Sequence, residues 1–124
     1  MKAKFSKKYS VKNEHSAAKI GSGALEVLST PSMIAYMENA AYELCQKNIE
    51  DTTLETTVGI FLEVKHLQAS STMSEIEIII TKCKREGRVF TLDMEAYDKE
   101  QLIGQATHQR IVVNIERFMA KLKK

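Results

Sequence analysis

The chain has no tryptophan, a single proline and only two cysteines, and it contains no long hydrophobic run. Crossing a bilayer takes about 20 consecutive apolar residues, so we expect no membrane partner. Cys45 and Cys83 show no zinc-ligand spacing and are too few for a disulfide framework, which indicates a reducing compartment and no metal site. The first residues are charged and no apolar stretch follows them, so we expect no secretory signal peptide and a cytoplasmic protein.

The chain also lacks an excess of charge of one sign, because 18 Lys and Arg residues face 16 Asp and Glu residues and the net charge is +2. Proteins that bind nucleic acids broadly carry a basic face or stripe. The charges here are well mixed along the chain, and we expect no nucleic-acid partner. The length suits one hydrophobic core, and no repeat or linker interrupts the sequence. We therefore expect a single domain over residues 1–124.

Residues 29–45 form the most apolar helical pattern in the chain. On a helical wheel with about 100° per residue, one wide stripe is apolar: Met33, Met37, Ala40, Ala41 and Leu44. Ala35 and Tyr42 extend the apolar surface, so we expect a largely buried helix with little surface left for water. Thr30 is a suitable N-cap residue, and Pro31 fits the first helical position, where no N–H is needed.

Glu38 is the exception on this helix, because it lies at the border of the apolar stripe, beside Ile34 and Cys45. A solvated helix glutamate is the common explanation, since Glu is rarely buried without a partner. This helix offers little surface to water, which favours a partly buried carboxylate. Glu38 is therefore a candidate for a functional site.

Strand patterns precede and follow this helix. They cover residues 4–12, 58–66, 73–83, 89–97 and 102–113. In the second pattern, Val58, Ile60, Leu62 and Val64 share one parity, and His66 continues it towards the interior. The charged turn at residues 84–88 contains a glycine where a positive φ is useful.

The remaining connections fit the same arrangement. Residues 24–28 form a short strand or turn before the helix, residues 98–101 form a turn, and residues 114–123 form a terminal helix. A lone apolar helix followed by an antiparallel meander predicts an α+β architecture in which the sheet curls round the helix and buries it.

Five segments between Gly21 and Val113 form a more specific pattern. They are residues 21–23, 28–41, 57–59, 64–69 and 107–110. Together they resemble the fluoroacetyl-CoA thioesterase-like family of the hotdog superfamily. The resemblance implies the hotdog fold, an antiparallel β-sheet wrapped round one long central helix, in agreement with the helix and strand patterns. It also implies a homodimer with acyl-thioester sites at the subunit interface, coenzyme A thioester as the substrate, and no cofactor.

The resemblance places the family's catalytic threonine, glutamate and histidine on Thr30, Glu38 and His66. It places a glycine near the thioester carbonyl on Gly59. Arg110 is a further candidate for substrate binding, through the phosphates of coenzyme A. The sequence departs from the family after His66, where a threonine, a proline and a glycine are replaced by residues 70–73, in the loop that shapes acyl selectivity.

Thioester hydrolysis needs an attacking oxygen, a proton donor and a group that stabilises the oxyanion. Glu38 is either the nucleophile or the general base that activates a water. His66 either protonates the departing thiolate or pairs with Glu38, and the Thr30 hydroxyl bonds to the carboxylate or to the substrate. The Gly59 N–H is the candidate oxyanion donor. Simpler structural alternatives exist for each residue: a cap for Thr30, a core histidine for His66 and a strand bulge for Gly59.

The sequence therefore predicts hydrolysis of a short-chain acyl-CoA to free acid and CoA, with an acyl group that the residues do not specify. The alternative is a non-catalytic dimer that binds or senses acyl-CoA. A hotdog hydratase is less compatible, since the Asp/His hydratase motif is missing. His15 and His108 are other histidines that do not fall on the catalytic position.

Overall fold

The computed structural model describes residues 5–123, in which one long helix and five strands dominate. The elements are β1 (Phe5–Ser10), the 3-10 turn η1 (Asn13–His15), α1 (Ala17–Ile20), α2 (Thr30–Gln46), β2 (Glu55–His66), β3 (Glu75–Glu86), β4 (Val89–Asp98), β5 (Gln101–Asn114) and α3 (Ile115–Ala120). The predicted helix and all five predicted strands are confirmed, with Lys4 outside the described residues. The short elements η1 and α1 had no clear sequence signal.

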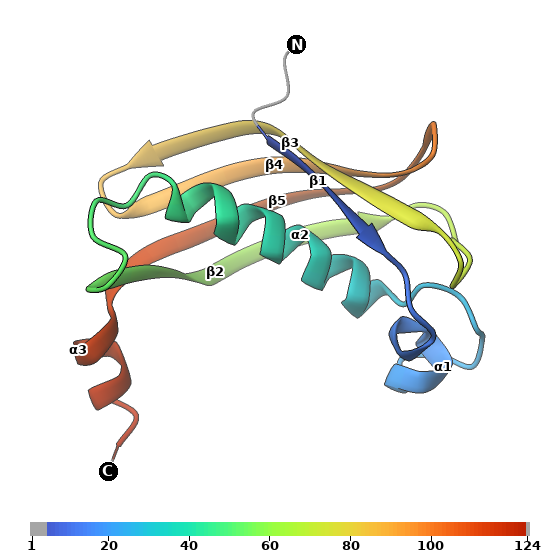
Figure 1. Cartoon of the computed structure of the whole chain (residues 1–124), viewed down its shortest axis with the longest axis horizontal. Helices are drawn as coiled ribbons and strands as arrows, with labels where there is room; N and C mark the ends of the chain where they lie inside the picture. The colour runs from blue at the N-terminus through green and yellow to red at the C-terminus, as the bar shows by residue number, and fades with distance from the viewer. Residues whose placement is uncertain (1–4, 124) are drawn as a thin grey trace.

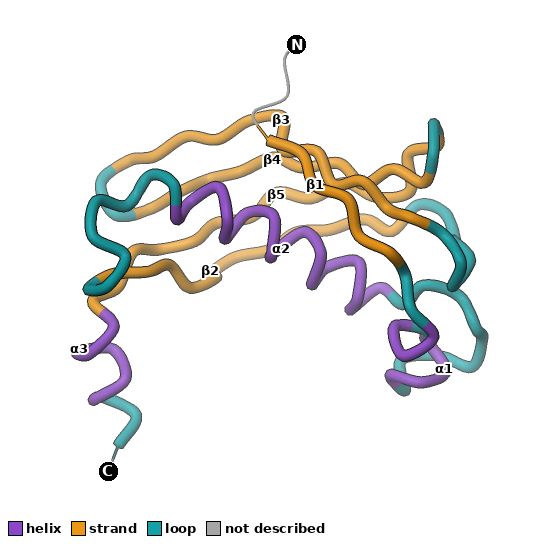
Figure 2. The backbone as a smooth tube through the Cα atoms, viewed as in Figure 1, coloured by secondary structure: helices purple, strands orange, loops and turns teal. Residues whose placement is uncertain are grey.

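The five strands form one antiparallel sheet in the order β1-β3-β4-β5-β2, and the sheet curves round α2 (Figure 1). Strands β3, β4 and β5 follow one another as hairpins, whereas β2 returns to pair with β5 at one edge and β1 pairs with β3 at the other. Figure 2 shows the single long helix lying along the sheet, with α3 projecting away at the end of β5. The predicted α+β architecture is confirmed.

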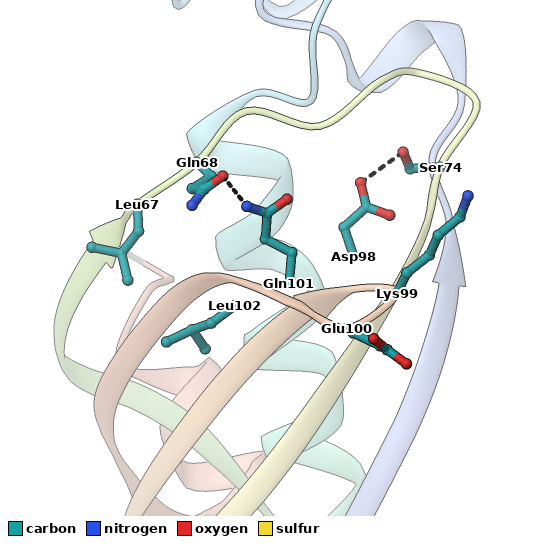
Figure 3. A pocket seen from close by; sticks show the side chains of 8 residues that line it. All are labelled: Leu67, Gln68, Ser74, Asp98, Lys99, Glu100, Gln101 and Leu102. Carbon is teal, nitrogen blue, oxygen red and sulfur yellow. Dashed lines mark hydrogen bonds between the residues drawn. The ribbon is translucent and has the colours of Figure 1, made fainter.

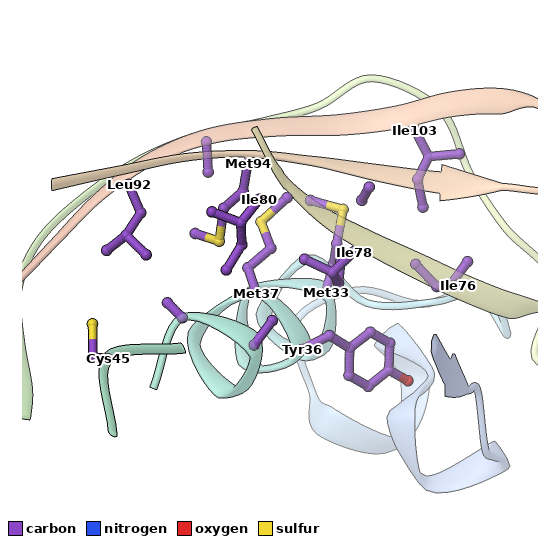
Figure 4. Close-up of a cluster of buried hydrophobic side chains, with 14 of the residues drawn as sticks. Met33, Tyr36, Met37, Cys45, Ile76, Ile78, Ile80, Leu92, Met94 and Ile103 are labelled. Carbon is purple, nitrogen blue, oxygen red and sulfur yellow. The ribbon is translucent and has the colours of Figure 1, made fainter. Parts of the chain in front are cut away.

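The core lies between α2 and the concave face of the sheet (Figure 4). Met33, Met37, Ala40 and Ala41 of the predicted stripe are fully buried. They pack against a larger set of fully buried strand side chains: Ile76, Ile78, Ile80, Phe90, Leu92, Met94 and Ile103. Burying aliphatic side chains in this way supplies the main favourable term in folding.

The helix is less enclosed than the wheel predicted. Tyr42 is 39% exposed and Ala35 is also exposed, while Leu44 is only half-buried at the edge of the core. Tyr36 and Cys45, which were not part of the predicted stripe, are buried instead of Leu44. The prediction of little wet surface was wrong because the sheet covers α2 from one side only, and a wheel does not show where that cover stops.

The N-cap of α2 is Ser29 and not Thr30. Ser29 has extended backbone angles (φ −76°, ψ 151°), and its hydroxyl accepts a hydrogen bond from the N–H of Ser32 at 3.1 Å. Thr30 is thus the first helical residue and Pro31 the second. The N–H groups of the first turn have no partner within the helix, so the N–H that proline lacks removes no helical hydrogen bond. The Thr30 hydroxyl is therefore free for another partner.

Strand β2 contains a bulge that changes which residues face inward. Gly59 lies opposite Arg110 and Phe61 lies opposite Gln109, so Ile60 is an extra residue on the β2 side. The prediction that Ile60 faces inward was wrong, since Ile60 is 51% exposed. Because one inserted residue reverses the alternation, Thr57 and Gly59 face the helix before the bulge, and Leu62, Val64 and His66 face it afterwards.

The chain ends and turns largely follow the sequence pattern. The charged turn is shorter than predicted, because β3 continues to Glu86 and only Gly87 takes a positive φ, 63°. Asn114 caps α3 by accepting a hydrogen bond from the N–H of Arg117. No helix within the described part of the chain is long and apolar enough to cross a membrane.

Candidate active site

The first pair of predicted residues lies where α2 begins and β2 ends. Thr30 Oγ1 and His66 Nδ1 are 2.7 Å apart and share a hydrogen bond across 36 residues of sequence. The contact is available because Ser29 has taken over the capping role. Thr30 and His66 also line a hollow of about 270 Å³, together with Leu28, Ser29 and Gln68.

The His66 imidazole is set up to act as a neutral base or as a donor. Burial lowers the pKa of His66 below its usual value, and an interaction with the backbone at Gln68 opposes this effect. Its second ring nitrogen, Nε2, is buried and has no hydrogen-bond partner within residues 5–123. The same holds for the Ser70 hydroxyl. Buried polar atoms are normally paired, so the free Nε2 is a feature that a ligand or another subunit can satisfy.

Glu38 lies further along α2, against Gly59 of β2. A Cβ atom placed on Gly59 would lie 3.2 Å from Glu38 Oε2 and 3.1 Å from His108 Cε1. Glycine at this position therefore lets the carboxylate approach the β2 backbone. Glu38 is half-buried, and within residues 5–123 its side chain makes no hydrogen bond or ion pair.

Arg110 is buried beneath Gly59, at 8% exposure, and is held by three hydrogen bonds. Its Nε and Nη2 donate to Thr57, at 2.9 Å to the hydroxyl and 3.1 Å to the carbonyl, and its Nη1 donates to His108 Nε2 at 3.1 Å. Burial lowers the pKa of Arg110, and Glu38 is among the groups that raise it. The guanidinium thus lies within the electrostatic reach of Glu38, and its role in binding substrate stays a prediction.

His108 is the residue that the sequence pattern underrated. It is 1% exposed, and Nδ1 lies 2.8 Å from the Phe61 carbonyl. Burial lowers the pKa of His108, the Arg110 charge lowers it further, and Glu38 raises it. The Thr-His-Gln-Arg motif could have indicated this pair, because residues two apart on a strand share a face.

The predicted residues form two separate groups on the inner face of the sheet. Thr30 bonds to His66 at one end of α2, and Glu38 lies beside Gly59 and Arg110 about 12 Å further along the helix, from a rise of about 1.5 Å per residue. Glu38 and His66 share no hydrogen bond within the described chain.

A larger hollow than the one at His66 contains none of the predicted residues. It measures about 850 Å³ and lies at the β4–β5 turn, where Figure 3 shows Gln101 donating to Gln68 and Ser74 donating to Asp98. Its lining includes no histidine, and the Ser74–Asp98 pair in it lies outside the residues that the family resemblance implies. Gln68 also lines the smaller hollow at His66, so the two hollows adjoin. We place the candidate active site at the smaller one and at Glu38.

Within residues 5–123, no three His, Cys, Asp or Glu side chains come together as metal ligands.

Known proteins define the class of this fold. A solved point mutant of the fluoroacetyl-CoA-specific thioesterase, in complex with fluoroacetate and CoA, superposes with a TM-score of 0.89 at 24% identity over 97% of both chains. A hot-dog-like protein from Thermanaerovibrio acidaminovorans superposes with a TM-score of 0.83 at 21% identity, over 94% of this chain and 85% of the other. The architecture is the hotdog fold, as the resemblance implied.

The sequence comparison then gives the family. The family model described as fluoroacetyl-CoA-specific thioesterase matches residues 11–116. A fluoroacetyl-CoA thioesterase from Streptantibioticus cattleyicolor is 29% identical over 98 residues, which cover 79% of this chain and 69% of the relative. The chain belongs to the fluoroacetyl-CoA-specific thioesterase family and is thus a member of a family of thioester hydrolases, which confirms the resemblance seen in the sequence.

Proposed function

We propose that the protein hydrolyses a short-chain acyl-CoA thioester to the free acid and CoA. Membership of a thioesterase family supports the reaction class. The observation that carries the assignment to this site is the half-buried Glu38 carboxylate, which makes no hydrogen bond or ion pair within residues 5–123 and faces Gly59. We take residues 1–124 as one catalytic domain that needs no cofactor, and we propose a cytoplasmic location.

In this proposal Glu38 supplies the attacking oxygen. As a general base it takes a proton from water, and the hydroxide attacks the thioester carbonyl. As a nucleophile it attacks the carbonyl itself and forms a mixed anhydride, which water then hydrolyses. In both cases the negative oxygen that forms is stabilised by the Gly59 N–H, and the Arg110 charge lies nearby. The C–S bond then breaks and CoA leaves as a thiolate.

His66 assists the departure of the thiolate by donating a hydrogen bond to its sulfur, and the proton that CoA finally carries comes from the water molecule consumed in the hydrolysis. A histidine whose pKa is lowered by burial is neutral near pH 7. If Nδ1 accepts a hydrogen bond from the Thr30 hydroxyl, Nε2 carries the hydrogen, and this N–H has no hydrogen-bond partner within the described residues. Thr30 therefore sets the tautomer of His66 in this proposal, and the Nε2–H is the group that meets the substrate.

We propose that two copies of the chain complete each site as a homodimer. Strand β2 is a 12-residue edge strand, and Ile60 and Phe61 on it are 51% and 47% exposed. A long apolar edge strand invites pairing with another strand. Antiparallel pairing of two β2 strands about an axis at Glu63, with the bulged Ile60 left out of the register, puts Gly59 of one protomer opposite His66 of the partner subunit. Glu38 then meets the His66 that its own chain keeps at a distance.

A non-catalytic acyl-CoA-binding or sensing dimer is the alternative function. It shares the fold and the interface but predicts stoichiometric binding without turnover. A panel of acyl-CoA thioesters assayed for free thiol separates the two functions, because only an enzyme releases thiol beyond one equivalent per site. The same panel identifies the acyl group, including any preference for fluoroacyl substrates.

The site assignment is tested with Glu38→Gln, which keeps the size of the side chain and removes its charge. Turnover should fall at least ~100-fold, the contribution of a positioned acid–base group, while the unfolding midpoint stays unchanged. His66→Ala should lose a similar factor, and the double variant should be little worse than either single one. Glu43→Gln is the matched control on the same helix. Glu43 forms an ion pair with Lys7 of β1 and is not one of the candidate site residues. Normal turnover in Glu38→Gln would refute the assignment.

The hydroxyl of Thr30 gives a graded version of the same test. Thr30→Ser retains the hydroxyl that bonds to His66, so the loss should be mild. Thr30→Ala removes that bond and should reduce turnover to an intermediate level. Equal turnover in both variants would mean that the hydroxyl does not orient His66.

A further inference from the structure

The two halves of the candidate site share one face of the sheet only because of the bulge at Ile60. Gly59 and His66 are seven residues apart, and in a regular strand an odd separation puts two residues on opposite faces. The extra residue restores them to one face: Gly59 lies against Glu38, and His66 bonds to Thr30. Whatever fixes the bulge therefore fixes the geometry of the site.

His108 contacts the bulge directly. It lies opposite Leu62 on β5, and its Nδ1 is 2.8 Å from the Phe61 carbonyl, immediately after the inserted residue. A carbonyl oxygen only accepts, so Nδ1 carries the hydrogen and donates it. The other ring nitrogen lies 3.1 Å from Arg110 Nη1, which only donates, so Nε2 accepts. Both bonds together define one neutral tautomer of a fully buried imidazole.

This tautomer is stable in its surroundings. The groups that face His108 are the Arg110 guanidinium and the Glu38 carboxylate, which act in opposite directions on its protonation. A proton added to Nε2 would point at Arg110, where like charges would meet and the bond from Nη1 would be lost. The imidazole is thus a fixed neutral link between the β2 bulge and Arg110, and the reaction proposed above does not use it as an acid or base.

We propose that His108 is a positioning residue, whose Nδ1–H holds the bulge that brings Gly59 and His66 to the same face of the sheet. The inference rests on the proposed function. Losing the donation removes the hydrogen bond from His108 to the Phe61 carbonyl and frees the β2 backbone on both sides of Ile60. Gly59 N–H and His66 Nε2 then shift relative to each other, whereas the hollow that receives the substrate remains.

Two substitutions separate the two hydrogen bonds of His108. Asparagine places an amide N–H where Nδ1 is and keeps the bond to Phe61, whereas glutamine places its amide near Nε2 and keeps the bond to Arg110. We expect His108→Asn to retain most of kcat. We expect His108→Gln to lower kcat by roughly 100-fold with little change in KM, the loss expected from a misplacement of about 1 Å.

A second bulge in the sheet provides the matched control. Strand β3 has an inserted residue at Thr81, whose hydroxyl donates to the Asp93 carbonyl, and none of the candidate residues adjoins it. Thr81→Val should leave both kcat and KM unchanged. A loss of kcat in Thr81→Val equal to that in His108→Gln would show that any bulge in the sheet has this effect, and would overturn the assignment to His108.

Amide hydrogen exchange across residues 59–66 provides a readout that is independent of catalysis. His108→Gln should exchange faster there than wild type, and His108→Asn should not. If the wild type hydrolyses no acyl-CoA, the proposed function fails and the exchange data alone decide whether His108 holds the bulge. If His108→Gln does not fold, His108→Asn decides: retained kcat supports the inference. A loss of kcat in His108→Asn as large as in His108→Gln, or normal kcat in His108→Gln, overturns it.

Discussion

Glu38→Gln and His66→Ala, each inactive alone, should restore activity when the two variants form a mixed dimer. The expectation follows from the separation of Glu38 and His66 within one chain, about 12 Å along α2 from Thr30 to Glu38, and from the exposed β2 edge. In the proposed dimer each site takes Glu38 and Gly59 from one protomer and the Thr30–His66 pair from its partner. A mixed dimer therefore carries both changes in one site and neither in the other.

The size of the recovery follows from counting sites. Random association of equal amounts gives about half mixed dimers, and one of the two sites in each is intact, so about a quarter of the wild-type turnover should return. Each variant alone retains about one-hundredth or less of the wild-type turnover. If one chain supplies the whole site, every site of a mixed dimer still has one defect, and turnover stays at that background.

The assay is thiol release after the two variants are unfolded together in urea and refolded. Carrying a different affinity tag on each variant allows the mixed dimer to be isolated and counted. Glu38→Gln mixed with Gly59→Ala is the control, because both changes fall in the same half of the site and no intact site forms. Background turnover in a verified Glu38/His66 mixed dimer would refute the shared site. A wild-type protein that is fully active and has the mass of a monomer in light scattering would refute it as well.

Three further outcomes follow from the structure. Gly59→Ala should abolish most turnover without unfolding the protein, because the new methyl group would lie 3.2 Å from Glu38 Oε2; kcat and the thermal midpoint together test this. Burial lowers the pKa of His108, so the unfolded chain binds more protons and stability should fall as pH drops below about 6.5. Urea unfolding at several pH values should show a shallower loss in His108→Asn. Met37→Ala should cost about 2–5 kcal/mol, and Leu44→Ala clearly less, because Met37 is fully buried and Leu44 only half-buried; equal costs would contradict the burial argument.

The helix and the strands were predictable because their signals are local. The stripe of methionine and alanine on α2 repeats with helical periodicity, and the turns between β3, β4 and β5 carry their own glycine or polar residues. The cover of the helix was not predictable, since it depends on how far the sheet extends. Tyr42 therefore looked buried on the wheel although it is 39% exposed.

The candidate site was predictable in its residue types but not in its geometry. A resemblance assigns Thr30, Glu38 and His66 to one reaction, yet only the three-dimensional structure shows that Thr30 bonds to His66 while Glu38 lies beside Gly59. The alternation of residues along β2 did not predict which side chains face inward, because Ile60 has the same apolar character as the inward residues around it. A bulge inserted in an apolar run leaves no mark in the hydrophobic pattern.

The contacts of Glu38 bear on the choice between an enzyme and a binding protein. Three N–H groups of Arg110 are occupied by Thr57 and His108, so the guanidinium is fixed close to Glu38 without bonding to it. A carboxylate held in a salt bridge would have its oxygens occupied, and attack on a carbonyl or a water would first have to break that bond. Glu38 instead keeps a nearby positive charge, and its oxygens make no hydrogen bond or ion pair to the part of the chain that the structure describes. Such a carboxylate suits turnover, whereas passive binding of a CoA thioester would gain nothing from an unpaired negative charge beside its carbonyl.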